Sequence, residues 1–416
     1  MVEVRPQEVA ALVWSFAYFF CLLAGYYVLR PLRDEMGIAG GVRNLQWLFT
    51  ATFVVMLAAV PVFGALVARL PRKRFVPLVY HFFVLNIAIF WVLLTLGYEK
   101  VHVARVFFVW ISVFNLFAVS VFWSFMADLW GSDSGKRLFG FIAAGGSAGA
   151  LLGPSVTVLL AVPLGPVNLL IVAAVLLELA VLCAHKLENV APHREGADKA
   201  PEPASIGGSW LAGIAMVLRS PYLAGIALWV TLLSLAGTFL YFQQANIVAA
   251  ASDDPAVRTR IFATIDLAIG ILTILVQFFA TGRLIARFGV GAAAAALPLV
   301  FALGFCALAF TPALAVVIAF QALQRATNFA LSNPAREILF TVLDRGEKYK
   351  AKNVIDIVVF RGADAASGWL FSALRGVGLE LSAISLATVP VAGLWLALAL
   401  GLGRGQERRA KGAAVP

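Results

Sequence analysis

The sequence Leu343-Asp-Arg-Gly-Glu-Lys-Tyr-Lys-Ala-Lys-Asn-Val-Ile-Asp-Ile-Val-Val-Phe-Arg-Gly362 is the most polar passage in an otherwise apolar second half of the chain. It also has a counterpart earlier in the chain. Both copies predict the end of one helix, a short charged loop, and a basic residue that opens the next apolar helix. Shifting the sequence by just over half its length aligns three residue pairs: Asp344 with Asp128, Lys352 with Lys136, and Gly362 with Gly146.

A second match has nearly the same separation. Gly64-Ala-Leu-Val-Ala-Arg69 corresponds to Gly282-Arg-Leu-Ile-Ala-Arg287. Two matches in the same order indicate a duplicated chain.

The composition of the chain identifies its class. Of 416 residues, 62% are hydrophobic and only 13% are charged, and the mean hydropathy is +0.91. A soluble protein needs more charge than this to cover its surface, so the chain is expected to be a membrane protein in a lipid bilayer. The net charge of +10 lies in short loops between apolar runs, which fits membrane orientation rather than nucleic-acid binding.

Apolar runs of membrane-spanning length recur through the chain. They predict an all-α, polytopic membrane protein with twelve transmembrane helices in two pseudo-symmetric six-helix bundles. The expected spans are 9–33, 44–68, 75–97, 103–127, 138–160, 164–184, 222–247, 259–281, 290–310, 313–342, 353–374 and 379–402. The expected parts are an N-terminal half (1–185), a cytoplasmic linker (186–208), a C-terminal half (209–403) and a basic cytoplasmic tail (404–416).

The distribution of Lys and Arg predicts the orientation. Most of these residues lie on alternate loops, among them the linker and the tail, and cytoplasmic loops carry such an excess. We therefore expect a cell (inner) membrane protein with both termini in the cytoplasm. We also expect it to be a monomer.

The end of the first span, Gly25-Tyr-Tyr-Val-Leu-Arg-Pro-Leu-Arg-Asp-Glu-Met-Gly37, carries the first candidate site. Arg30 and Arg33 are on one helical face, Asp34 is four residues from Arg30, a spacing that allows an ion pair, and Pro31 favours a kink. One interpretation is a cluster of long side chains that reach the membrane surface. The other is a cationic patch at the mouth of a cavity.

Glycines mark the fifth span as a packing surface. Gly145, Gly149 and Gly153 form a ridge of small residues that allows another helix to approach closely. Substrate contact is the alternative interpretation of this ridge.

The tenth and eleventh spans hold charges at membrane depth, where ionisable residues indicate function. An ion pair is the structural interpretation of Arg361 with its acidic neighbours, whereas Arg325 has no acid within a helical turn of sequence. Asp266, in the eighth span, is either a partner for Arg325 or a proton site. The charged set of these two spans is Arg325, Arg336, Glu337, Asp356, Arg361 and Asp364.

Three passages resemble the bacterial and plastid ATP/ADP translocases, nucleotide exchange transporters related to the major facilitator superfamily. They are Tyr27-Val-Leu-Arg-Pro-Leu-Arg-Asp34, then Phe122-Trp-Ser-Phe-Met-Ala-Asp128 with Gly135–Gly140, and Asn333-Pro-Ala-Arg-Glu337 with Lys350–Arg361. The family's Lys in the third passage is Arg336 here, and the first passage contains a proline that the translocases lack. The resemblance implies nucleotide exchange, with six phosphate-facing residues: Arg30, Arg33, Lys136, Arg336, Lys352 and Arg361.

The expected substrate is therefore an anion such as a nucleotide. We expect Arg325, Arg336 and Arg361 to line one cavity, with Arg30 and Arg33 towards its outer end. The paired loops, with Asp128 and Lys136 in one copy and Asp344 and Lys352 in the other, are expected to hold the inner side shut.

Other functions remain open at this point. A proton-coupled facilitator that exports another solute is one, because Gly149-x-x-x-Gly153-Pro154 resembles the motif of facilitator antiporters and Asp266 or Asp364 can carry a proton. A membrane sensor or assembly factor is another, although buried charge argues against it. An enzyme is not expected, because the sequence shows no nucleophile–base pair, and we expect no metal and no cofactor.

Overall fold

The computed structural model describes residues 5–69, 72–190, 210–279, 281–344, 347, 351–352 and 354–413. For residues 60, 63–69, 72–74, 131–136, 210–212, 278–279, 281–286, 288, 357 and 412–413 only the backbone is described. The predicted linker falls largely outside the described residues.

The described residues form helices joined by short turns. The first half contains α1 (Val9–Ala39), α2 (Leu45–Arg69), α3 (Arg72–Thr95), α4 (Lys100–Leu164) and α5 (Leu169–Val190). The second half contains α6 (Trp210–Arg219), α7 (Pro221–Ala251), α8 (Pro255–Phe279), α9 (Thr281–Phe310), α10 (Leu314–Thr327), α11 (Asn333–Leu339), α13 (Phe360–Gly376) and α14 (Leu381–Ala413). Two π-helices, η4 (Asn328–Ser332) and η6 (Val354–Val359), precede α11 and α13.

Contacts divide the chain into two compact units. The first comprises Met1–Ala200 with Ser252–Leu267, and the second comprises Pro201–Ala251 with Ala268–Pro416. The boundary therefore falls within α8, whose first half clusters with the N-terminal helices.

Eleven segments among the described residues are long and apolar enough to cross a membrane. They agree with eleven of the twelve predicted spans. The remaining one, predicted at 353–374, is helical but divided between η6 and α13, and α13 has only 17 residues. Helix α13 also carries three charged residues, Arg361, Asp364 and Arg375.

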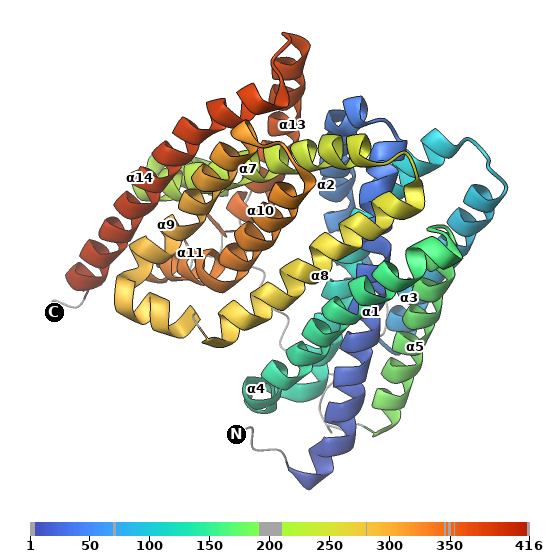
Figure 1. The fold of residues 1–416 in the computed structure, drawn as a ribbon. Helices are drawn as coiled ribbons and strands as arrows, with labels where there is room; N and C mark the ends of the chain where they lie inside the picture. The colour runs from blue at the N-terminus through green and yellow to red at the C-terminus, as the bar shows by residue number, and fades with distance from the viewer. Residues whose placement is uncertain are drawn as a thin grey trace. The chain divides into compact units, whose positions relative to one another are not determined.

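Helix α1 is the axis of the first unit, with α4 and α5 packed along it (Figure 1). The two parts of α4 run along α1 in opposite directions. Arg105 bonds the carbonyl of Gly40 and Trp130 bonds Ser15, so the first part is antiparallel to α1. The second part is parallel to α1, since Gly145 packs on Phe16 and Gly153 on Ala24. The chain therefore reverses direction within α4, which corresponds to two predicted spans, 103–127 and 138–160.

The second unit repeats one of these pairings. Ser234 on α7 lies 3.2 Å from the carbonyl oxygen of Phe360, and the ring of Phe242 lies 5.2 Å from that of Phe371 on α13. Helix α7 thus runs parallel to α13, as α1 does to the second part of α4. This correspondence supports the duplication that the sequence predicts.

The glycine ridge of α4 lies directly against the α1 backbone. A Cβ at Gly149 would lie 2.4 Å from the carbonyl oxygen of Phe20, and one at Gly145 would lie 2.5 Å from that of Phe16. These distances are too short for any side chain, so helix packing accounts for the ridge.

We predict that Gly149→Ala lowers the apparent melting temperature of the purified protein in scanning fluorimetry. The added methyl group forces α1 and α4 apart, and overpacking of this kind costs about 1–3 kcal/mol. Gly140→Ala is the matched control, because a Cβ there meets no atom within 4 Å. It should leave the melting temperature unchanged or raise it, since Ala favours helix. Equal melting temperatures for both variants would show that the ridge does not determine this packing.

Candidate functional site

The C-terminal part of α1 carries charge into the apolar core of the first unit. Arg30 Nη1 lies 3.0 Å from Asp266 Oδ1 of α8, and the two side chains are 12% and 4% exposed. The pair satisfies the requirement that a charge at membrane depth be neutralised. The sequence analysis considered Asp266 as a partner for Arg325 or as a proton site, whereas the structure pairs it with Arg30.

Arg33 lies near Arg30 but has different surroundings. Its Nη1 is 3.5 Å from Asp34 Oδ1, and its guanidinium carbon is 4.2 Å from the centre of the Phe108 ring. An arginine stacked on an aromatic face gains a cation–π interaction. Because these contacts hold its plane, Arg33 presents a fixed positive charge beside the Arg30–Asp266 pair.

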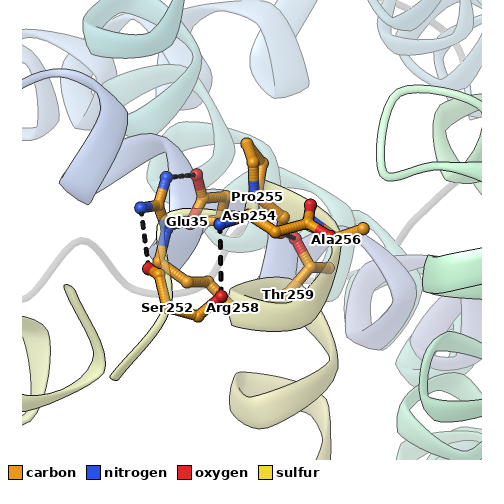
Figure 2. A network of polar contacts seen from close by, with 7 residues as sticks. All are labelled: Glu35, Ser252, Asp254, Pro255, Ala256, Arg258 and Thr259. Carbon is orange, nitrogen blue, oxygen red and sulfur yellow. Dashed lines mark hydrogen bonds and ion pairs between the residues drawn. The ribbon is translucent and has the colours of Figure 1, made fainter. Parts of the chain in front are cut away.

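A second ion pair joins the same helices and was not identified from the sequence. Both carboxylate oxygens of Glu35 accept from Arg258, at 2.7 Å from Nε and 2.8 Å from Nη2 (Figure 2). The two side chains are 2% and 12% exposed. This fork-like geometry is the strongest arrangement for an arginine and a carboxylate.

The start of α8 orients Arg258. The Asp254 carboxylate accepts from the backbone N–H of Ala256 at 2.9 Å, which caps the helix, and Arg258 Nη1 donates to the Ser252 carbonyl at 3.2 Å (Figure 2). The Ser252-Asp-Asp-Pro255 sequence is a helix-start signal. It would have placed Arg258 inside the helix rather than at the membrane surface.

In the second unit, two ion pairs join α11 to the segment that follows it. Arg336 Nη1 lies 3.3 Å from Asp356 Oδ1, and Lys352 Nζ lies 2.6 and 2.7 Å from the Glu337 oxygens. Lys352 thus bonds Glu337, whereas the loop residue expected beside it, Asp344, is exposed. Glu337 is half exposed, so its pair contributes at most about 1 kcal/mol to stability.

Asp364 of α13 is held mainly by hydroxyl groups. Its Oδ1 accepts from Ser234 at 2.5 Å and from Thr238 at 3.2 Å, both on α7. Arg361 Nη1 is farther away, 3.6 Å from Oδ2, and its side chain is 39% exposed. The structural interpretation of the sequence therefore holds for Arg361 with Asp364, while Asp356 pairs with Arg336.

The remaining predicted residues lie elsewhere. Arg325 is half-buried on α10. The residue before it, Gln324, belongs to an amide network in which Gln324 donates to Gln321 and Gln321 donates to Gln244. Asp128 is half-buried on α4, and the side chain of Lys136 lies outside those described. Within the described part of the chain, no group of three or more His, Cys, Asp or Glu residues is arranged to hold a metal.

We predict that Arg30→Gln and Asp266→Asn each lower the apparent melting temperature by several degrees. Each single change leaves the other charge buried without its partner, which typically costs about 3–5 kcal/mol. The double variant Arg30→Gln/Asp266→Asn should lose less than the sum of the two, because no lone charge remains. Arg43→Gln, at an exposed arginine, serves as the control. Additive losses in the double variant would show that the two residues do not stabilise one another.

The comparisons with known proteins identify the fold. No protein-family model matches the chain, and no curated protein matches it in sequence. Solved transporter structures match it over nearly its whole length.

Three of these structures illustrate the likeness. A point mutant of the nucleoside transporter NupG has a TM-score of 0.68 and 12% identity, covering 97% of this chain and 99% of that one. A POT family transporter in complex with 5-aminolevulinic acid has a TM-score of 0.63 and 12% identity, covering 95% of this chain and 96% of that one. An inward-facing bacterial homolog of the human lysosomal transporter Spinster has a TM-score of 0.58 and 14% identity, covering 98% of each chain. The chain therefore has the all-α fold of these transporter structures, and with its membrane-spanning helices it is a multi-pass membrane protein.

Proposed function

We propose that this chain is a secondary transporter that carries a small anion across the membrane by alternating access, with nucleotide exchange as its specific activity. The fold supports transport in general, since the similar structures are transporters of small molecules. The resemblance of three passages to ATP/ADP translocases supports the nucleotide. The proposed location is the inner membrane with both termini in the cytoplasm, on the distribution of Lys and Arg.

The observation that carries the proposal is the buried Arg30–Asp266 pair. Arginine binds phosphate oxygens as readily as carboxylates, through the same planar fork of donors. In this structure the Asp266 carboxylate lies 3.0 Å from Arg30, and a substrate phosphate would replace it there. Substrate binding is then a replacement of one anion by another, with Arg33 supplying the further charge that a polyanion requires.

The Arg30–Asp266 pair also bears on whether transport must be an exchange. If these arginines had no partner in the absence of substrate, burying their charge would oppose closure of the unloaded protein. Only the loaded protein would then complete the cycle, which would enforce antiport. Asp266 removes this penalty for Arg30, so exchange rests on the resemblance to the translocases and on competition between anions, not on uncompensated charge.

A second function, proton-coupled transport of another solute, is favoured by the burial of Asp266. Its side chain is 4% exposed. If substrate takes Arg30 while the site is dry, the displaced carboxylate is stable there only as a protonated acid. Proton coupling would then accompany each binding event.

The decisive assay is uptake of labelled ATP into proteoliposomes that are empty or loaded with ADP. We expect uptake that requires internal nucleotide and does not respond to an imposed pH gradient. Uptake driven by the gradient into empty vesicles would establish the second function instead. If the protein neither binds nor moves any nucleotide, the substrate assignment fails and the fold is unaffected.

Two substitutions test the roles of individual residues. Arg30→Gln should abolish ATP binding, because it removes the phosphate ligand. Asp266→Asn should tighten ATP binding by about tenfold if the internal pair is closed nine-tenths of the time, because the competing carboxylate is gone. Isothermal titration calorimetry measures both, with Glu99→Gln, at a carboxylate that is 60% exposed, as the control.

Arg325→Gln extends this test to the second unit. Loss of exchange with retained folding would support its predicted role as a phosphate ligand, and exchange at the parent rate would exclude it. Lys352→Ala and Lys136→Ala test the gating role of the paired loops in the same assay. Unchanged exchange in both of these variants would rule that role out.

A further inference from the structure

Two ion pairs of opposite polarity join α1 to the first half of α8. Glu35 on α1 contacts Arg258, and Arg30 on α1 contacts Asp266. The order of the contacts shows that the two helices run antiparallel. A slide that brought Asp266 level with Glu35 would oppose two carboxylates, so the alternation of charge fixes one register.

These pairs hold a particular part of the chain. Arg258 and Asp266 belong to the segment Ser252–Leu267, which clusters with the first unit, whereas α8 from Ala268 onward clusters with the second. The last of these ion pairs, at Asp266, lies one residue before Leu267, where α8 leaves the first unit. By sequence, α8 belongs to the C-terminal half of the chain, but its first residues pack in the first unit.

The energetics of these contacts differ between dry and wet surroundings. All four side chains are at most 12% exposed, and buried opposite charges that lose their partners are strongly destabilised. Once water enters, each group is hydrated separately and the pair contributes little. The contacts are therefore stable when closed and dry, and inexpensive to separate when open and wet, which is the behaviour of a two-state element.

We propose that Arg30, Glu35, Arg258 and Asp266 form a latch between α1 and the first half of α8, which is closed in this structure and must open in every transport cycle. The Glu35–Arg258 fork acts as a positioning contact: it holds α8 so that Asp266 reaches Arg30. When the fork opens, α8 withdraws Asp266 and Arg30 becomes available to a substrate anion. The link to transport rests on the proposed function, whereas opening of the latch is a property of the chain alone.

Opening can be measured without any substrate. Ala263, which lies between Arg258 and Asp266 on α8, is fully buried and serves as the reporter position. The variant Ala263→Cys is prepared with the native cysteines replaced by alanine: Cys21, Cys183 and Cys306. In detergent solution a hydrophilic maleimide reaches both sides of the protein. The rate at which it labels the reporter cysteine therefore measures the population of molecules in which the latch is open.

We expect slow labelling in this background and labelling about tenfold faster with Glu35→Gln, because the closed state loses a buried pair. The reversed pair Glu35→Arg/Arg258→Glu should return the rate to within about threefold of the background. Glu99→Gln is the matched control, since Glu99 also pairs with a basic side chain, His102, but is 60% exposed. Labelling of Glu35→Gln at the background rate would overturn the latch, as would a reversed pair that labels as fast as the single variant.

A second experiment does not depend on folding of the reversed pair. Glu35→Cys/Arg258→Cys is joined by a short, reducible bifunctional thiol reagent, and nucleotide exchange is compared before linking, after linking and after reduction. We expect exchange to fall by about tenfold on linking and to recover on reduction, since the population that opens is removed. Equal rates with and without the link would overturn the latch. Absence of exchange in the parent protein would instead defeat the proposed function and leave the labelling result standing.

Discussion

A guanidinium inside an apolar helix bundle is stable only when another group neutralises its charge. In the first unit, the Arg30–Asp266 pair meets this requirement and determines how α1 and the start of α8 must lie. The Glu35–Arg258 fork repeats the requirement nearer the helix ends. In the second unit, Arg336 pairs with Asp356, whereas the more exposed Arg361 lies 3.6 Å from Asp364. Electrostatic neutrality at membrane depth thus places the helices that carry the candidate site.

The same requirement explains why such residues suit transport. Buried ion pairs contribute little net stability compared with apolar packing, so a chain that retains them does so at a cost to its fold. An arginine in such a pair can, however, exchange its carboxylate for a substrate anion, provided that the displaced carboxylate meets water or takes up a proton. Apolar packing, such as the glycine ridge of α4 on α1, has no equivalent alternative and remains fixed. The fold therefore combines rigid apolar contacts with a few exchangeable polar ones.

Hydropathy was sufficient to predict the helices, because crossing an apolar layer demands long apolar runs. It was insufficient for the charged pairs. The first span was predicted to end at residue 33, but α1 continues through Pro31 to Ala39 and buries Glu35. The eighth was predicted to start at residue 259, but α8 starts at Pro255 and includes Arg258. Which arginine Asp266 would contact depends on how two distant helices pack, and no local sequence signal reports that.

The central claim is that Asp266 holds the position of the substrate anion on Arg30. Infrared difference spectroscopy on the purified protein tests it most directly, by comparing spectra with and without ATP. The account predicts a carboxylate band that changes when ATP binds and disappears from the difference spectrum of Asp266→Asn. A parent protein that binds ATP with no change in any Asp266 carboxylate band would contradict it.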